Sequence, residues 1–122
     1  MSDKSLKSQL IRFRALPLPR PEGAKSPPAP RHLDAVERRL WRQIVSDFEF
    51  SDGAALAVLR AGLEAHQRMR RCRETIDREG ESIRDKWGQI KAHPLLAAER
   101  DARAAFLAAM RALGVLETGR SA

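Results

Sequence analysis

The spacing of apolar residues along the chain predicts two long helices joined by a short hairpin. From residue 52 to residue 79, large apolar residues recur at every third or fourth position, as one face of an α-helix requires. These residues are Leu56, Leu59, Leu63, Met69, Cys72 and Ile76, with His66 on the same stripe. A second stripe follows Pro94 and predicts the second long helix. It consists of Leu95, Ala98, Ala102, Ala105, Phe106, Ala109 and Leu113.

Glycine and proline predict where these two helices begin and end. Gly80 can end the first helix and Gly114 the second, because glycine accepts the backbone angles of a helix C-terminus. The segment between the helices lacks the helical period, and Gly88 can adopt the positive φ of a tight turn. We therefore expect a β-hairpin over about residues 81–92. Pro94 can occupy the first position of the following helix, where its missing N–H has no partner to lose.

A shorter amphipathic helix is predicted before the first long one. Its apolar stripe is Val36, Leu40, Trp41, Ile44, Val45 and Phe48. Asp34 followed by Glu37 resembles a capping box at its start, and Asp52 can cap the next helix. Only a few residues separate the two helices, so they should pack as an antiparallel or angled pair. Such a pair is compatible with simple structural packing and also with a helix-turn-helix that reads DNA.

These patterns predict a mainly α fold, with a helical core over residues 32–115 and a short tail over 116–122. A helix of about 28 residues is about 42 Å long, whereas a compact globule of roughly 90 residues is about 30 Å across. We therefore expect the long helix to project with its apolar stripe exposed, and neighbouring subunits of an oligomeric ring to cover it. The residues expected at this oligomer interface are Leu56, Leu59, Leu63, Met69, Ile76, Trp87 and Phe106.

Positive charge is concentrated at the N-terminus. The chain of 122 residues has a formal net charge of +7, and residues 1–31 carry +5 of it. Six of the seven prolines also lie in this segment, which predicts a disordered, extended arm. A basic arm of this kind either contacts nucleic acid or another acidic surface, or keeps the protein soluble. The candidate DNA-binding residues in the arm are Lys4, Lys7, Arg12, Arg14, Arg20, Lys25 and Arg31.

The first long helix carries a second group of basic residues. Residues 66–73 contain no acid, and the arginine side chain can pair two phosphate oxygens at once. The candidates here are Arg68, Arg70, Arg71 and Arg73. The same pattern would also fit a solvated face with salt bridges to a neighbour. Trp87, at the hairpin turn, is the aromatic residue whose position predicts exposure, and it could stack on a base or pack against helices of its own or a neighbouring subunit.

No catalytic or cofactor-binding motif emerges from the sequence. His32, His66 and His93 lie in separate elements, without a metal-binding spacing. The glycines form no phosphate-binding loop, and the single cysteine, Cys72, fits a buried structural thiol. We expect a protein without enzymatic activity, cofactor or metal. No apolar run approaches 18 residues and no signal peptide is evident, so we expect no membrane association.

The order of these features resembles the small subunits of tailed-phage DNA-packaging terminases. The resemblance covers about residues 27–115, and four stretches carry it. They are Pro27–Leu33 followed by Leu40-Trp41-Arg42; Asp52 with Leu56 and Leu59; Gly80; and Lys91–Leu95 followed by Leu113-Gly114. The hairpin turn, Asp85-Lys86-Trp87-Gly88, departs from the Gly/Asn/Pro-rich tip that the family pattern leads one to expect.

The resemblance implies a non-catalytic subunit that forms a homo-oligomeric ring and binds double-stranded DNA of the viral genome. It would present this DNA to the terminase large subunit, which holds the ATPase and nuclease, in the cytoplasm of a bacterial host carrying a phage or prophage. Two other classes fit the residues alone: a dimeric helix-turn-helix transcriptional regulator, and a helical adaptor that does not bind DNA. The length of the predicted 52–79 helix argues against the regulator, because recognition helices are usually short.

Overall fold

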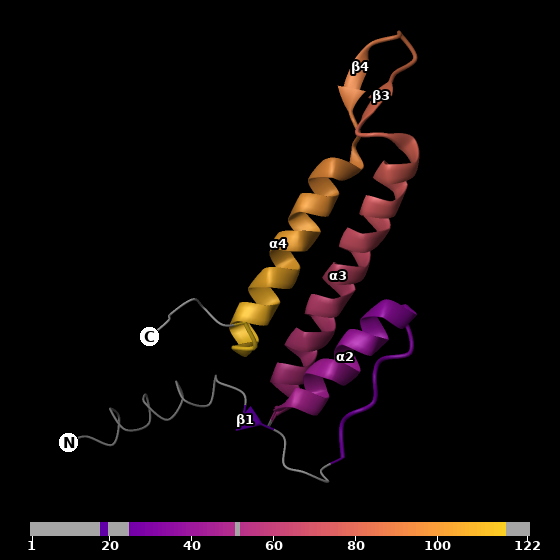
Figure 1. Ribbon diagram of the computed structural model, residues 1–122. Helices are drawn as coiled ribbons and strands as arrows, with labels where there is room; N and C mark the ends of the chain where they lie inside the picture. Colours follow the sequence, from indigo (N-terminus) through magenta and orange to yellow (C-terminus); the bar gives the residue numbers. More distant parts are fainter. Residues whose placement is uncertain (1–17, 20–24, 51, 117–122) are drawn as a thin grey trace, which may run out of the picture.

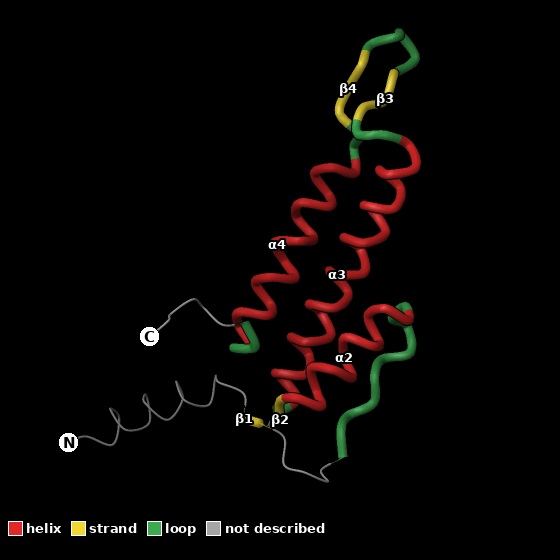
Figure 2. Tube along the Cα trace, viewed as in Figure 1, coloured by secondary structure: helices red, strands yellow, loops and turns green. Residues whose placement is uncertain are grey.

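The computed structural model describes residues 18–19, 25–50 and 52–116. Three helices lie within these ranges: α2 (Ala35–Asp47), α3 (Gly53–Glu79) and α4 (Leu95–Leu113). α3 and α4 run antiparallel along each other, and α2 packs against the part of α3 that is remote from the hairpin (Figure 1). The hairpin of β3 (Ser82–Arg84) and β4 (Ile90–Ala92) extends beyond the other end of the α3–α4 pair (Figure 2). The predicted mainly α fold with a β-hairpin is confirmed.

Local capping groups set the ends of the long helices as predicted. The Asp52 carboxylate accepts a hydrogen bond from the backbone N–H of Ala55 at 2.9 Å, which satisfies one of the free donors at the start of α3. Gly80 ends α3 with a φ of 94°, and Gly114 ends α4 with a φ of 74°. Residues with a Cβ rarely adopt such angles, so both ends depend on glycine.

α4 begins one residue later than predicted, and a histidine supports its start. Pro94 occupies the N-cap position instead of the first helical position. The Nδ1 atom of the buried His93 accepts a hydrogen bond from the backbone N–H of Leu95 at 3.0 Å. Its Nε2 atom lies 2.8 Å from a carboxylate oxygen of Glu79. His93 therefore ties the end of α3 to the beginning of α4.

α3 and α4 approach closely because a glycine lies between them. A Cβ atom added at Gly62 would lie 2.7 Å from Cβ of Ala109 and 3.2 Å from Cε of Met110. The core continues from this contact to α2 and the segment before it. Its buried residues are Leu33, Trp41, Val45, Leu59, Leu63, Met110 and Leu113.

The expected exposure of the α3 stripe is wrong. Leu59 and Leu63 are fully buried and Ile76 is 1% exposed within the single chain. The hairpin folds α4 back along α3, so that most of the length of the long helix is covered without a neighbouring subunit (Figure 1). The expectation holds only for a roughly spherical core, whereas two antiparallel helices form an elongated core that accommodates a long helix.

The expected capping box at the start of α2 is also wrong. Asp34 is the N-cap residue, but its side chain makes no capping hydrogen bond. Its backbone N–H donates instead to the side-chain oxygen of Gln67 on α3, at 2.5 Å. Glu37 turns inward and is fully buried, while Val36, expected in the core, is 38% exposed. Arginine side chains of α3 attract the carboxylates of Asp34 and Glu37, so these carboxylates do not form the capping box.

The hairpin turn depends on Asp85 and Gly88. One carboxylate oxygen of Asp85 accepts hydrogen bonds from the backbone N–H groups of Trp87 and Gln89, both at 2.9 Å. The hydrogen bond from Gln89, supported by those from Trp87 and Lys91, lowers the pKa of Asp85 against the opposing effect of burial. Gly88 has a φ of 83°. The carboxylate therefore organises a turn that lacks the expected Gly/Asn/Pro-rich tip.

Part of the chain that precedes α2 lies against the helical core. Leu18 and Pro19 form a short strand, β1 (Leu18–Pro19), which pairs antiparallel with β2 (Phe48–Glu49) directly after α2. The indole N–H of Trp41 donates to the backbone carbonyl of Pro27 at 2.9 Å. No helix among the described residues combines the length and the apolar character that crossing a bilayer would need.

Candidate nucleic-acid interface

Arg70 on α3 is surrounded by carboxylates. Its guanidinium contacts both oxygens of Glu37, at 3.0 and 3.1 Å, and one oxygen of Asp34 at 2.5 Å. A third carboxylate, that of Glu74 one turn along α3, lies 2.7 Å away. The hydrogen bond with Glu37 raises the pKa of Arg70, although desolvation opposes the shift. A DNA phosphate would have to compete with these partners for Arg70.

Glu37 is the buried centre of this contact between α2 and α3. One of its oxygens lies 2.6 Å from Nδ1 of His66, whose ring packs edge-on against Phe106 of α4. Burial acts to raise the pKa of Glu37, but the hydrogen bonds from Arg70 and His66 outweigh it and hold the pKa below its ordinary value. His66 therefore faces a helix interface, as its place on the apolar stripe predicted. We name Asp34, Glu37, His66, Arg70 and Arg71 the α2–α3 cluster.

Arg71 completes the cluster at its exposed edge. Its guanidinium donates to both oxygens of Asp34, at 2.7 and 3.1 Å. The hydrogen bond from Arg71 lowers the pKa of Asp34, desolvation opposes this effect, and Arg70 lowers it further. The Arg71 side chain is still 59% exposed, so it can reach a ligand on the surface.

Arg73 points to the other partner helix. Its guanidinium contacts Glu99 of α4 at 2.9 and 3.2 Å. Glu99 is 5% exposed and also accepts a hydrogen bond from Arg103 at 3.1 Å. Two arginines thus neutralise a buried carboxylate between α3 and α4, a role that is structural in this arrangement.

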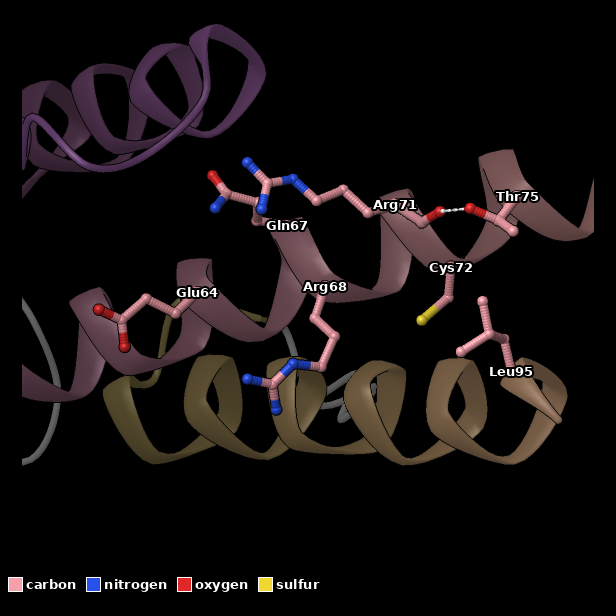
Figure 3. A pocket seen from close by; sticks show the side chains of 7 residues that line it. All are labelled: Glu64, Gln67, Arg68, Arg71, Cys72, Thr75 and Leu95. Carbon is pink, nitrogen blue, oxygen red and sulfur yellow. Dashed lines mark hydrogen bonds between the residues drawn. The ribbon is translucent and has the colours of Figure 1, made fainter.

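Arg68 differs from the other predicted α3 arginines. It is exposed and has no ion-pair or hydrogen-bond partner among the residues that the structure describes. Its side chain lines a hollow of about 390 Å³ together with Cys72 and Leu95 (Figure 3). Cys72 is 7% exposed, which confirms the predicted buried thiol. Arg68 and Arg71 are therefore the α3 candidates that remain accessible to a phosphate.

A scan against protein-family models matches residues 38–121 of this chain to the phage terminase small subunit family. The chain belongs to this family. The match includes α3, the hairpin, α4 and most of α2. It therefore covers the stretches that carry the resemblance in sequence, except for Pro27–Leu33. A search of curated proteins and a search of solved structures each found no match. Membership of the family assigns the chain a role in phage DNA packaging.

The basic arm of this terminase small subunit falls largely outside the described residues. Lys4, Lys7, Arg12, Arg14 and Arg20 all lie there. Lys25 and Arg31 are described and are exposed. Arg31 lies three residues before the N-cap of α2, so the arm joins the core at the beginning of this helix.

The residues expected at an oligomer interface fall into three groups. Leu59, Leu63 and Ile76 belong to the buried core of the single chain. Leu56, Met69 and Phe106 are partly buried. Trp87 is 72% exposed at the hairpin turn, and Ile90 beside it on β4 is 68% exposed. With this exposure Trp87 does not pack back onto the described helices of its own chain. The ammonium of Lys86 lies over its ring, 4.7 Å from the ring centroid.

Each of the three histidines pairs with a glutamate. His32 and Glu64 lie 2.6 Å apart at an exposed position, and the part-buried pairs formed by His66 and His93 are described above. Within the described ranges, no group of three or more His, Cys, Asp and Glu residues could hold a metal ion. The two members of each pair are far apart in the sequence, so the spacing of residues along the chain does not predict the pairs.

Two further accessible arginines, Arg39 and Arg42, lie on α2 and are not among the predicted site residues. Both are exposed, and neither has a partner among the described residues. A signal for them was present: removing the apolar stripe of α2 from its helical projection leaves these arginines on the opposite face.

Proposed function

We propose that this chain is the non-catalytic, DNA-recognising small subunit of a phage terminase. It binds double-stranded viral DNA, assembles into a homo-oligomeric ring and presents the DNA to the large subunit, inside the bacterial host. The observation that carries the proposal is the family match over residues 38–121, which places the chain in DNA packaging. The basic arm over residues 1–31 supports a direct contact with DNA, because phosphate attraction supplies much of the affinity for duplexes.

The proposed organisation has an N-terminal arm over residues 1–31, a core over 32–115 and a tail over 116–122. Arm residues and the accessible α3 arginines, Arg68 and Arg71, provide phosphate contacts that do not depend on base sequence. Arg70 and Arg73 take part mainly by holding α3 to its neighbours. Any choice of the packaging start site then comes from base edges or from DNA shape.

A titration of the full-length protein with a labelled DNA duplex at several salt concentrations tests the proposal. We expect tight binding at low salt that weakens steeply as salt is added. The double substitution Arg12→Gln and Arg14→Gln should lower the slope of log affinity against log salt by about 0.9 for each phosphate that is no longer neutralised. The matched control, Arg78→Gln with Arg100→Gln, removes the same charge at exposed positions near the hairpin end, and its slope should equal that of the wild type.

An unchanged slope in the arm variant would exclude Arg12 and Arg14 as phosphate contacts. No binding by the wild type at about 50 mM salt, where phosphate contacts are strong, would contradict DNA recognition and favour the helical adaptor. A dimer that binds a palindrome would favour the transcriptional regulator. Light scattering on the same samples gives the mass that separates a dimer from a ring.

A further inference from the structure

The outward face of α2 carries positive charge that nothing in the fold uses. Ala35, Arg39, Arg42 and Ser46 are spaced at i, i+4, i+7 and i+11, and all four are exposed. This spacing aligns them along one side of the helix, turned away from the buried Glu37 and Trp41. We name these four residues the outer stripe of α2. It presents two guanidinium groups, flanked at either end by a small residue.

The arginines of the outer stripe differ from those of α3 in their partners. Arg70, Arg71 and Arg73 each contact at least two carboxylate oxygens of other residues. Arg39 and Arg42 contact no carboxylate among the residues that the structure describes. The outer stripe therefore has its full charge available to a ligand.

The acids of α2 and of its N-cap contact neither Arg39 nor Arg42, and the one at the end of the outer stripe, Asp47, is contacted by Ser46 at 3.5 Å. Glu37, one of the two acids within α2, is fully buried and bound by Arg70 and His66. The carboxylate of Asp34, at the N-cap, is bound by Arg70 and Arg71. The second acid of α2, Asp47, is its last residue and accepts a hydrogen bond from Gln43. The middle of the exposed face thus carries arginine without a compensating carboxylate.

The helix that bears the outer stripe is firmly held. The α2–α3 cluster binds its first turn to α3, and the Trp41 indole donates to Pro27 on the preceding segment. A helix anchored in this way presents its exposed arginines from a fixed backbone, so that less conformational entropy is lost when a ligand binds. Arg70 and Arg71 of α3 thereby serve to position α2, whose Arg39 and Arg42 face the solvent.

We infer that Arg39 and Arg42 on the outer stripe of α2 contact the phosphate backbone of duplex DNA. The inference rests on the proposed function. It assigns the principal contact between the helical core and DNA to α2 instead of α3. Guanidinium groups pair two phosphate oxygens at once, and Ala35 and Ser46 leave room for a DNA strand along the helix. The exposed Arg31 lies three residues before the N-cap of α2, so the basic segment of the sequence leads into the helix that carries the outer stripe.

Fluorescence anisotropy with a labelled duplex tests the inference on the full-length protein and its variants. We expect Arg39→Gln with Arg42→Gln to lower the salt slope by about 1.8, at about 0.9 for each of two phosphates. The ratio of affinities at 50 and 200 mM salt should therefore fall about tenfold relative to the wild type. The control, Arg78→Gln with Arg100→Gln, removes the same charge from side chains that are 68% and 76% exposed, and should retain the wild-type slope.

A second variant tests the same stripe while leaving both arginines in place. Ala35→Glu adds a carboxylate at the first position of α2, where a negative charge favours the helix, so the fold should be retained. It should weaken DNA binding by repulsion. Arg39→Lys with Arg42→Lys keeps both charges and should largely keep the salt slope, with weaker binding because the planar fork is absent.

The outcomes separate this inference from the proposed function. A wild-type protein that fails to bind DNA contradicts the proposed function itself. A wild type that binds, together with an Arg39→Gln/Arg42→Gln variant of unchanged slope, overturns only the inference about α2. Light scattering gives the assembled mass of every variant. A variant whose mass differs from that of the wild type would indicate that the outer stripe is a contact between subunits, and would overturn the inference. Normal DNA binding combined with failure to bind the large subunit would assign the stripe to a protein partner, and would also overturn the inference.

Discussion

Glu37 shows how a single residue can reverse its expected role. Its position three residues after Asp34 suggested a helix-capping group, but its side chain is fully buried between α2 and α3. It accepts hydrogen bonds from Arg70 and lies 2.6 Å from His66. A buried carboxylate is tolerated only when charged partners and hydrogen bonds offset its desolvation, and the α2–α3 cluster supplies both.

The α2–α3 cluster predicts a loss of stability in acid. The pKa of Glu37 is lowered in the fold, so its contribution to stability is complete above about pH 4.5, its ordinary value. This contribution is lost as the pH falls below that value and through the lowered pKa of the folded state. Glu37→Gln should lower the free energy of unfolding at neutral pH by about 2 to 3 kcal/mol, because the substitution removes charged hydrogen bonds to a buried group. It should also show a smaller loss of stability on acidification than the wild type.

Urea denaturation followed by circular dichroism from pH 7 down to pH 3 measures both effects. The control is Asp101→Asn, whose carboxylate is 76% exposed and has only a 3.5 Å contact with Arg100. It should change stability by less than about 1 kcal/mol, as is usual for exposed ion pairs. Equal acid dependence in the wild type and in Glu37→Gln would show that Glu37 does not govern it.

At the scale of elements, the fold depends on how closely α3 and α4 approach. The contact at Gly62, where an added Cβ would lie 2.7 Å from that of Ala109, leaves no room for a side chain. Close approach brings the apolar stripes of both helices into contact over much of their length and buries Leu59, Leu63 and Met110. The helix pair is therefore held by packing along its whole length, with Glu99 and its arginines as a polar contact within it.

Gly62→Ala should destabilise the protein although alanine favours helix. The gain in helix propensity is at most about 1 kcal/mol, whereas overpacking of a tight core typically costs about 1 to 3 kcal/mol. We therefore expect a net loss of about 1 kcal/mol in the free energy of unfolding, measured in urea. Gly53→Ala is the matched control, since nothing lies within 4 Å of its added Cβ, and it should be neutral or slightly stabilising. A stabilised Gly62→Ala protein would mean that the helices can separate without cost.

At the scale of the whole molecule, the most exposed large apolar side chains of the described residues are on the hairpin and not along α3. The hairpin extends beyond the α3–α4 pair (Figure 1). Trp87 and Ile90 on it are largely exposed. No described element of the chain covers either side chain. If the small subunit forms a ring, as proposed, the hairpin offers apolar contacts for a second copy, whereas the buried Leu59, Leu63 and Ile76 do not.

Trp87→Ser with Ile90→Ser should therefore reduce the assembled mass in solution. The expected result is a wild-type species well above a tetramer and a variant that dissociates at concentrations where the wild type stays assembled, measured by light scattering coupled to gel filtration. Val36→Ser removes an exposed apolar side chain of α2, which is 38% exposed, and should leave the mass unchanged. A wild type that is monomeric or dimeric would contradict the ring, and an unchanged variant would exclude the hairpin as the contact.

The sequence by itself determined the three helices, the hairpin between the long ones and most of the helix ends. Asp52, Gly80, Gly88 and Gly114 act through groups within a few residues along the chain, so local backbone chemistry was enough to predict them. The apolar period likewise identified which face of each helix is buried. It also predicted the buried Cys72 and the exposed Trp87, because helical position and turn position are local properties.

Only the tertiary structure decided what lies against each face. The apolar stripe predicts that one face of α3 is covered, but either a neighbouring subunit or α4 could cover it. In the fold the hairpin turns the chain back, so that α4 covers this face. Charges depend even more on distant partners: Arg70 is bound by carboxylates 33 and 36 residues away, while Arg42 has none among the described residues. Charge pairing follows from distances across helices, which a linear pattern does not contain. The helical projection places Arg39 and Arg42 on the outer face of α2, but only the fold shows that no carboxylate among the described residues binds them.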